Sequence, residues 1–252
     1  MFRTFAEGLA AGRALTFGHR GARAYAPMNT LPSFEMALHM GAHGIEFDVR
    51  QTRDGDLVIL HDPTIDGTSN GHGAAGEMTF AELREFDFGG WFHAEYAGTA
   101  IPTLDEVFEA FGQRFLMNVE IKSEHLSGGG IEARVAEVIA RHHLEDRVLV
   151  SSFNLLTVWR FGRIMPHVLR GMLVEGVTPF EHGRLLKALD VRALHPYYPF
   201  VDAEYMQKAR ALGLAVNTWT VNDPAEAQRL AELGVSAVIT DRPDTILAAL
   251  GA

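Results

Sequence analysis

Short hydrophobic runs alternate with amphipathic stretches along almost the whole chain. This alternation is typical of a parallel sheet whose strands are joined by crossover helices. We predict strands at residues 14–18, 44–49, 56–60, 115–121, 148–152, 168–173, 191–195, 214–218 and 237–240. A spacing of 3.6 residues between apolar positions predicts helices at residues 32–40, 80–86, 104–111, 131–142, 155–164, 180–189, 203–212 and 224–233.

Capping residues support two of these helix boundaries. Thr103 and Glu106 have the spacing of a capping box, in which each side chain binds the other's backbone N–H. Asp223 followed by Pro224 is a typical helix start, because Asp caps and Pro fits the first turn.

The number of units indicates a closed barrel. If residues 56–60 are a short partner of the second strand, the other strands form eight β/α units. We therefore predict a TIM-type (β/α)8 barrel. A doubly wound open sheet is the alternative, but no Gly-rich phosphate-binding fingerprint follows the first strand.

Residues 62–100 interrupt the alternation. They are rich in Gly, Asp and Thr, and only residues 80–86 have helical character. We interpret this stretch as a small insertion after the second strand. The chain has 252 residues, close to the roughly 250 that are usual for one such barrel, so we predict a single domain over residues 1–252.

Composition limits the classes of function. The 47% of hydrophobic residues can form a large core, and the formal charge of −10 argues against nucleic-acid binding. The lack of cysteine excludes disulfides, thiolate nucleophiles and Cys-ligated zinc, and suits a reducing cytoplasm. Residues 1–15 resemble no signal peptide, and no later stretch reaches membrane-spanning length. We expect a cytoplasmic protein without membrane insertion; its oligomeric state stays open.

Polar residues stand at or just after the ends of the predicted strands, where the functional groups of such barrels gather. They are His19-Arg20, Glu46 and Asp48, His61-Asp62, Glu120 and Lys122, Asn217 and Trp219, and Thr240-Asp241.

Three of these residues suggest a metal site. Glu46 and Asp48 are two residues apart, so their side chains leave a strand on the same face, and Glu120 and Lys122 repeat this spacing on the next barrel strand. Three converging carboxylates would repel one another without a cation. An all-oxygen set suits one hard divalent ion, Mg²⁺ or Ca²⁺. The alternative is a buried ion-pair network with Lys122 and Arg20.

The other strand-end residues suggest chemistry around that site. His19 and His61 could divide the roles of general acid and general base. Arg20 and Lys122 could hold phosphoryl oxygens, and Trp219 could wall a substrate pocket. The alternatives are structural hydrogen bonding by each histidine and rim packing by Trp219.

An ordered series of motifs resembles the glycerophosphodiester phosphodiesterase family over nearly the whole chain. The motifs are His19-Arg20-Gly21, Asn29-Thr30, Ser33-Phe34 and Ala37, Glu46-Phe47-Asp48-Val49, Thr52-Arg53-Asp54-Gly55, His61-Asp62, Asn118-Val119-Glu120-Ile121-Lys122, Ser151-Ser152-Phe153, Trp219-Thr220-Val221-Asn222 and Thr240-Asp241-Arg242-Pro243. The resemblance implies a TIM-type barrel with an insertion after the second strand.

The resemblance also implies residue roles and a mechanism. Metal ligation falls to Glu46, Asp48 and Glu120, and acid–base catalysis to His19 and His61. The phosphate would be held by Arg20 and Lys122, and the pocket lined by Trp219. The glycerol 2-hydroxyl would attack phosphorus, and the resulting cyclic phosphate would open with water to give sn-glycerol 3-phosphate and an alcohol.

Two residues depart from the family pattern. Met28 precedes Asn29-Thr30, where most members carry Glu, and His43 stands where Asp, Asn or Tyr is common.

Two other functions stay open. A non-catalytic barrel that binds phosphate-containing ligands would have lost an essential group, and all the matched groups are present. A lysophospholipid phosphodiesterase would favour an apolar ring near the barrel mouth. Phe88, Trp91, Phe92 and Tyr96 could form such a ring, although packing onto the barrel explains them more simply.

Overall fold

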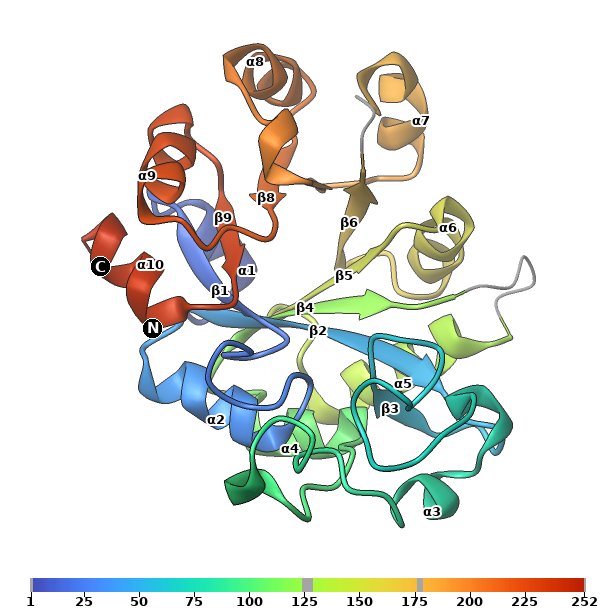
Figure 1. Ribbon diagram of the computed structural model, residues 1–252. Helices are drawn as coiled ribbons and strands as arrows, with labels where there is room; N and C mark the ends of the chain where they lie inside the picture. The colour runs from blue at the N-terminus through green and yellow to red at the C-terminus, as the bar shows by residue number, and fades with distance from the viewer. Residues whose placement is uncertain (1, 124–128, 176–178, 252) are drawn as a thin grey trace.

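The computed structural model describes residues 2–123, 129–175 and 179–251. Within these residues a nine-stranded sheet runs in the order β1-β9-β8-β7-β6-β5-β4-β2-β3, and β1 also pairs with β2. That pairing closes the sheet, and β3 is antiparallel to β2 while the eight other strands are parallel. The predicted (β/α)8 barrel is confirmed and the open sheet is excluded. Helices surround the barrel (Figure 1).

The strands lie close to their predicted positions. They are β1 (Leu15–His19), β2 (Gly44–Gln51), β3 (Leu57–Ile59), β4 (Leu116–Ile121), β5 (Val148–Ser152), β6 (Leu169–Val174), β7 (Ala193–Pro196), β8 (Ala215–Thr218) and β9 (Ala237–Thr240). Prediction and structure agree fully for β5 and β9 and differ by one or two residues at the ends of most others.

The α-helices are α1 (Phe5–Leu9), α2 (Leu31–His39), α3 (Phe80–Leu83), α4 (Leu104–Phe111), α5 (Ile131–His142), α6 (Leu155–Ile164), α7 (Gly183–Ala188), α8 (Ala203–Ala211), α9 (Pro224–Leu233) and α10 (Pro243–Leu250). Both caps predicted above are present: Thr103 and Glu106 form a capping box, and Asp223 accepts the Glu226 N–H. Two helices, α1 and α10, go beyond the predicted set. The helix predicted at residues 180–189 is instead a 3-10 turn (Pro179–His182) followed by the shorter α7.

The two ends of the barrel interior differ in polarity. At the N-terminal end a buried apolar cluster includes Leu15, Phe17 and Leu116. Phe5 of α1 stacks on Phe17 with 5.8 Å between ring centroids and so covers this end. The charged side chains therefore concentrate at the C-terminal ends of the strands.

The segment between β3 and α4 contains α3 and two 3-10 turns, Ala75–Glu77 and Ala94–Tyr96. It has a buried cluster of its own, to which Leu83 and Phe88 belong. The Tyr96 hydroxyl donates to the carbonyl of Tyr25 in the loop after β1. Packing therefore accounts for Phe88 and Tyr96, whereas Trp91 is 40% exposed.

No helix in the described ranges combines the length and apolar character that crossing a membrane requires.

Candidate active site

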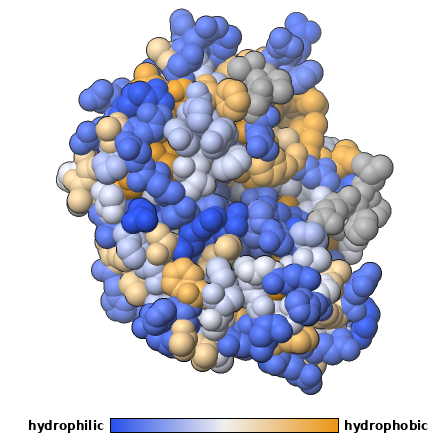
Figure 2. Space-filling view, viewed as in Figure 1, coloured by the Kyte–Doolittle hydropathy of each residue, from blue (hydrophilic) through white to orange (hydrophobic). Residues whose placement is uncertain are grey.

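The C-terminal ends of the strands surround a cavity of about 420 Å³. Its wall includes seven of the eight predicted site residues, namely His19, Arg20, Glu46, His61, Glu120, Lys122 and Trp219. Figure 2 shows hydrophilic residues around the hollow near the centre of this face, and hydrophobic residues on the side of α6 and α7.

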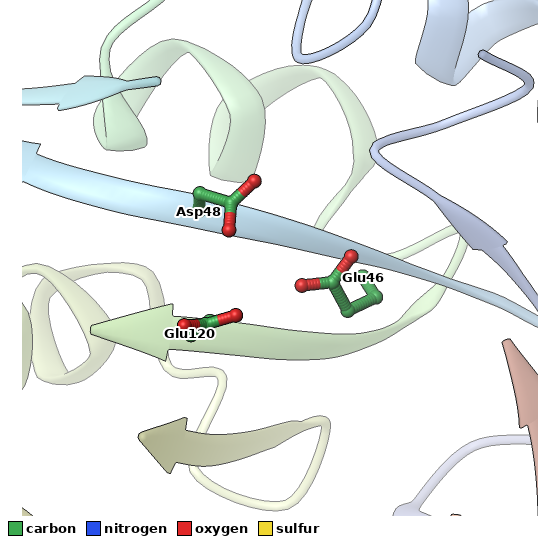
Figure 3. A group of neighbouring side chains, drawn as sticks. All are labelled: Glu46, Asp48 and Glu120. Atoms are coloured by element: carbon green, nitrogen blue, oxygen red, sulfur yellow. The ribbon is translucent and has the colours of Figure 1, made fainter. Parts of the chain in front are cut away.

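The three predicted metal ligands converge because of strand register. Asp48 on β2 lies opposite Glu120 on β4, and Glu46 lies opposite Asn118. Alternate residues of a strand face the same side, so the carboxylates point together (Figure 3). One oxygen from each lies within 4.8 Å of the others, and all three residues are buried.

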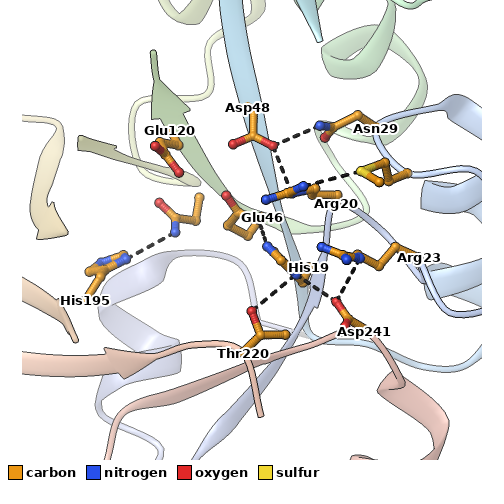
Figure 4. Close-up of polar contacts among 12 residues, drawn as sticks. His19, Arg20, Arg23, Asn29, Glu46, Asp48, Glu120, His195, Thr220 and Asp241 are labelled. Carbon is orange, nitrogen blue, oxygen red and sulfur yellow. Dashed lines mark hydrogen bonds and ion pairs between the residues drawn. The ribbon is translucent and has the colours of Figure 1, made fainter. Parts of the chain in front are cut away.

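Two cations partly balance this negative charge. The Lys122 Nζ lies 2.6 Å from a Glu120 oxygen and 3.0 Å from Asp48 Oδ1. The Arg20 Nε lies 3.2 Å from Asp48 Oδ2, to which Asn29 Nδ2 also donates at 2.8 Å (Figure 4). The ion-pair network considered as the alternative to a metal site is therefore present.

These contacts perturb the titration of Asp48 and Lys122. Burial would raise the pKa of Asp48, but the charges of Lys122 and Arg20 outweigh it and hold that pKa below its usual value. Burial would lower the pKa of Lys122, but Asp48 and Glu120 outweigh it and raise that pKa.

The ion pairs leave Glu46 without a matching cation. Its buried Oε2 accepts no hydrogen bond from any residue that the structure describes, and lies 3.9 Å from His19 Nε2. Burial, then the charges of Asp48 and Glu120, raise the pKa of Glu46 well above its usual value. Burial, then the charge of Asp48, raise the pKa of Glu120 to about 7 against the opposing charge of Lys122. A carboxylate oxygen without a donor beside two further carboxylates fits a divalent cation.

His19 is oriented by Asp241, a strand-end residue for which the sequence predicted no role. Its Nδ1 lies 2.7 Å from Asp241 Oδ1, so with a proton on Nδ1 the ring keeps Nε2 as an acceptor on the side of Glu46. Burial lowers the pKa of His19 to about 4, against the opposing effect of Asp241. The ring is therefore neutral near pH 7.

Asp241 is itself held in place. Asn222 Nδ2 donates to it at 2.8 Å, and Arg23 Nε lies 3.4 Å away. Burial would raise the pKa of Asp241, but the hydrogen bond with His19, the charge of Arg23 and the hydrogen bond from Asn222 outweigh it and lower that pKa. The carboxylate is therefore ionised and oriented toward His19.

His61 has a similar arrangement in a more open setting. Its Nδ1 lies 2.7 Å from Asp62 Oδ1, and the Asp62 side chain is 52% exposed. Burial lowers the pKa of His61, Asp48 opposes this, and Arg20 also lowers it. Both Nε and Nη2 of Arg50, at the end of β2, donate to the His61 carbonyl at 2.9 and 2.7 Å. Arg50 therefore ties the His61 segment to the strand that carries Glu46 and Asp48.

A third histidine, which the sequence did not single out, lies below the cavity. His195 is fully buried, with Nδ1 3.3 Å from Asn118 Nδ2 and Nε2 3.1 Å from Asn217 Nδ2. Burial lowers its pKa to about 3. The neutral ring therefore has a structural role, as a hydrogen-bonding partner of the two asparagines beneath the carboxylates.

Trp219 both lines the cavity and packs the rim. Its Nε1 donates to the His195 carbonyl at 2.8 Å, and its ring contacts those of Phe153 and Tyr197. The functional and the packing interpretations of this residue are therefore compatible.

The two departures from the family pattern lie in different places. Met28 is in the site, where its Sδ accepts a 3.3 Å contact from Arg20 Nη1. His43 lies at the start of β2, where its Nδ1 accepts the Thr16 N–H at 3.0 Å and its ring contacts Phe2. His43 thus has a structural hydrogen bond away from the carboxylates.

The fold and the site define a class: a TIM-barrel protein whose reactive groups lie at the C-terminal ends of its strands, as in the enzymes of this fold. The model of the glycerophosphoryl diester phosphodiesterase family matches residues 19–245, and the chain belongs to this family of phosphoric diester hydrolases. The resemblance seen in the sequence is confirmed.

Several relatives are similar over nearly their full length. The chain is 37% identical to a glycerophosphodiester phosphodiesterase of Caldanaerobacter subterraneus subsp. tengcongensis, over 93% of this chain and 97% of the relative. It is 36% identical to one of Bacillus altitudinis, over 90% and 94%. A solved phosphodiesterase of Oleispira antarctica, in complex with the product sn-glycerol-3-phosphate, superimposes with a TM-score of 0.91 at 32% identity, covering 97% of this chain and 99% of that one.

Proposed function

We propose that this protein hydrolyses glycerophosphodiesters to sn-glycerol 3-phosphate and an alcohol, with one Mg²⁺ or Ca²⁺ bound by Glu46, Asp48 and Glu120. The observation that carries the proposal is one cavity containing two histidines, each beside a carboxylate, and two cations beside a carboxylate triad. We also propose that residues 1–252 act as a single domain, with residues 62–100 inserted in it.

The bound ion would neutralise charge on a phosphoryl oxygen and orient the substrate. Arg20 and Lys122 line the cavity beside the triad, where they would bind phosphoryl oxygens. Trp219 would cover the organic part of the substrate.

In the proposed reaction His19 acts as the base and His61 as the acid. The neutral ring of His19 would take the proton of the glycerol 2-hydroxyl as its oxygen bonds to phosphorus. His61, which is less buried, would give a proton to the leaving alcohol oxygen as its bond to phosphorus breaks. Water would then open the five-membered cyclic phosphate, so that the sum is diester plus water to glycerol phosphate plus alcohol.

A panel of metals and substrates tests the proposal. Chelator-treated protein would be refilled with Mg²⁺ or Ca²⁺ and assayed on glycerophosphocholine, glycerophosphoethanolamine and a lysophospholipid. We expect turnover of the two short diesters and loss of this activity with chelator. Refilling with either Mg²⁺ or Ca²⁺ should restore the activity. Turnover of the lysophospholipid alone would favour the lipid phosphodiesterase, and binding of glycerol phosphate without turnover of any diester would favour the non-catalytic barrel.

A substrate analogue tests the nucleophile separately. A 2-deoxy diester should bind with similar affinity and react very slowly, because intramolecular attack gains effective molarities of about 10⁵ M or more. A near-normal rate on this analogue would instead indicate direct attack by water.

A further inference from the structure

The two halves of the cavity mouth carry different chemistry. On one side Arg20 follows β1 and Lys122 follows β4, and both face the carboxylates. On the other side four adjacent strands, β5 to β8, are each followed directly by an aromatic residue or an acid. These residues are Phe153, Glu175, Tyr197 and Trp219. Three of them, Phe153, Glu175 and Trp219, line the cavity, and the Tyr197 ring contacts that of Trp219.

The three aromatic rings form a corner around Trp219. The rings of Phe153 and Trp219 are 5.9 Å apart at an interplanar angle of 88°, and those of Tyr197 and Trp219 are 5.6 Å apart at 45°. The hydrogen bond from Trp219 Nε1 to the His195 carbonyl fixes the central ring. Phe153 is 44% and Tyr197 37% exposed, so a ligand can reach the corner.

Glu175 gives this aromatic corner a negative charge. Together with Leu173, Phe153 and Trp219 it lines the cavity, and it forms no ion pair with any residue in the described ranges. Those ranges supply no Lys or Arg to the cavity wall on the side of β5 to β8. Aromatic faces beside an unpaired carboxylate attract a positively charged group.

We propose that this corner, formed by Phe153, Glu175, Tyr197 and Trp219, selects diesters whose leaving alcohol carries an ammonium group. The inference rests on the proposed diesterase activity. With the phosphate held by Arg20 and Lys122, the alcohol half extends toward the opposite side of the same cavity. A neutral apolar alcohol would gain from the rings but not from the carboxylate.

The test compares two diesters of equal shape. The alcohol is choline in one and its uncharged isostere 3,3-dimethylbutanol in the other, and kcat/KM is measured for both. We expect the wild-type protein to prefer the choline diester by about three- to thirty-fold, the combined range of an exposed cation–π contact and an exposed ion pair. Equal kcat/KM for the two diesters would overturn the proposal.

Variants separate the two contributions. E175Q and F153L should each lower the choline preference by about two- to five-fold. The matched control E109Q removes the same charge from the exposed face of α4 and should leave the preference unchanged. A preference that persists undiminished in both E175Q and F153L would also overturn the proposal. Absence of hydrolysis of every diester would refute the proposed function itself, which is a different result from hydrolysis without preference.

Discussion

Glu46→Gln distinguishes a metal site from a self-sufficient ion-pair network. Glu120 and Asp48 have cationic partners, whereas Glu46 has none among the described residues. If the network alone explained the buried acids, Glu46→Gln would only relieve repulsion and stabilise the protein at neutral pH, because a carboxyl with a raised pKa disfavours the folded state above its unfolded pKa. If the acids bind a cation, the same change removes a ligand charge.

The expected loss of metal affinity follows from the distances. A unit charge at about 4 Å contributes about 4 kcal/mol at an effective dielectric constant of about 20. The triad oxygens lie within 4.8 Å of one another, so an ion placed between them would lie less than 4.8 Å from each oxygen. The amide keeps a weaker oxygen ligand, so we expect a net loss of about 3 kcal/mol, or roughly 100-fold in affinity.

The assay is calorimetric titration of chelator-treated protein with Mg²⁺ and Ca²⁺, together with thermal unfolding without metal. Glu132→Gln is the matched control, because Glu132 is also buried but lies on α5 in an ion pair with Arg160 at 2.9 Å. The control should lose stability and keep its metal affinity. Glu46→Gln should gain stability without metal and lose metal affinity. Equal metal affinity of Glu46→Gln and wild type would refute the ligand assignment.

Four further outcomes are expected. His19→Ala and His61→Ala should each lower turnover by about 10²–10⁴, and a p-nitrophenyl diester should restore the transfer rate to His61→Ala alone. Rescue of His19→Ala alone would reverse the assignment of acid and base, and equal rescue of both variants would refute it. Asp241→Asn should lower kcat by about 10²-fold or more with little change in KM, because the His19 tautomer is no longer fixed; steady-state kinetics would show this, and an unchanged kcat would contradict it. Arg50→Met should lower kcat by about 10- to 100-fold, because His61 is then misplaced. Arg50→Lys should recover part of the lost kcat, and identical kinetics of the two variants would contradict a hydrogen-bonding role. In the wild-type protein the unfolding free energy should fall as the pH falls from about 6.5 to about 3, because His195 with its pKa of about 3 stays neutral in the folded state while the unfolded chain takes up a proton. His195→Gln should make this fall smaller. Denaturant titrations across that pH range would measure it, and the same pH dependence in both proteins would contradict it.

The convergence of Glu46, Asp48 and Glu120 could be predicted because it depends only on strand periodicity and on β2 and β4 being neighbours. Both are visible in the order of hydrophobic runs. The helix predicted at residues 180–189 shows the limit of the same method, since periodicity does not distinguish a 3-10 turn from the first turn of an α-helix.

The partners of the two histidines could not be assigned in the same way. His19 and Asp241 are 222 residues apart, and they meet only because β9 pairs with β1 when the barrel closes. Arg50 reaches a backbone carbonyl, which every residue possesses, so no side-chain pattern marks His61 as its partner. Barrel closure would have brought Asp241 into consideration, because the ends of the first and last strands are then neighbours.

Met28 shows how one departure from the family pattern changes the balance of charge. A thioether is only a weak acceptor, so the contact of Arg20 with Met28 leaves Asp48 as the sole carboxylate paired with that guanidinium among the described residues. Glutamate at this position would supply a second acid and compete with phosphate for the same N–H groups. With methionine there, Arg20 keeps more of its donor capacity for an anionic substrate. The departure therefore lies beside the predicted phosphate site and is compatible with phosphate binding there.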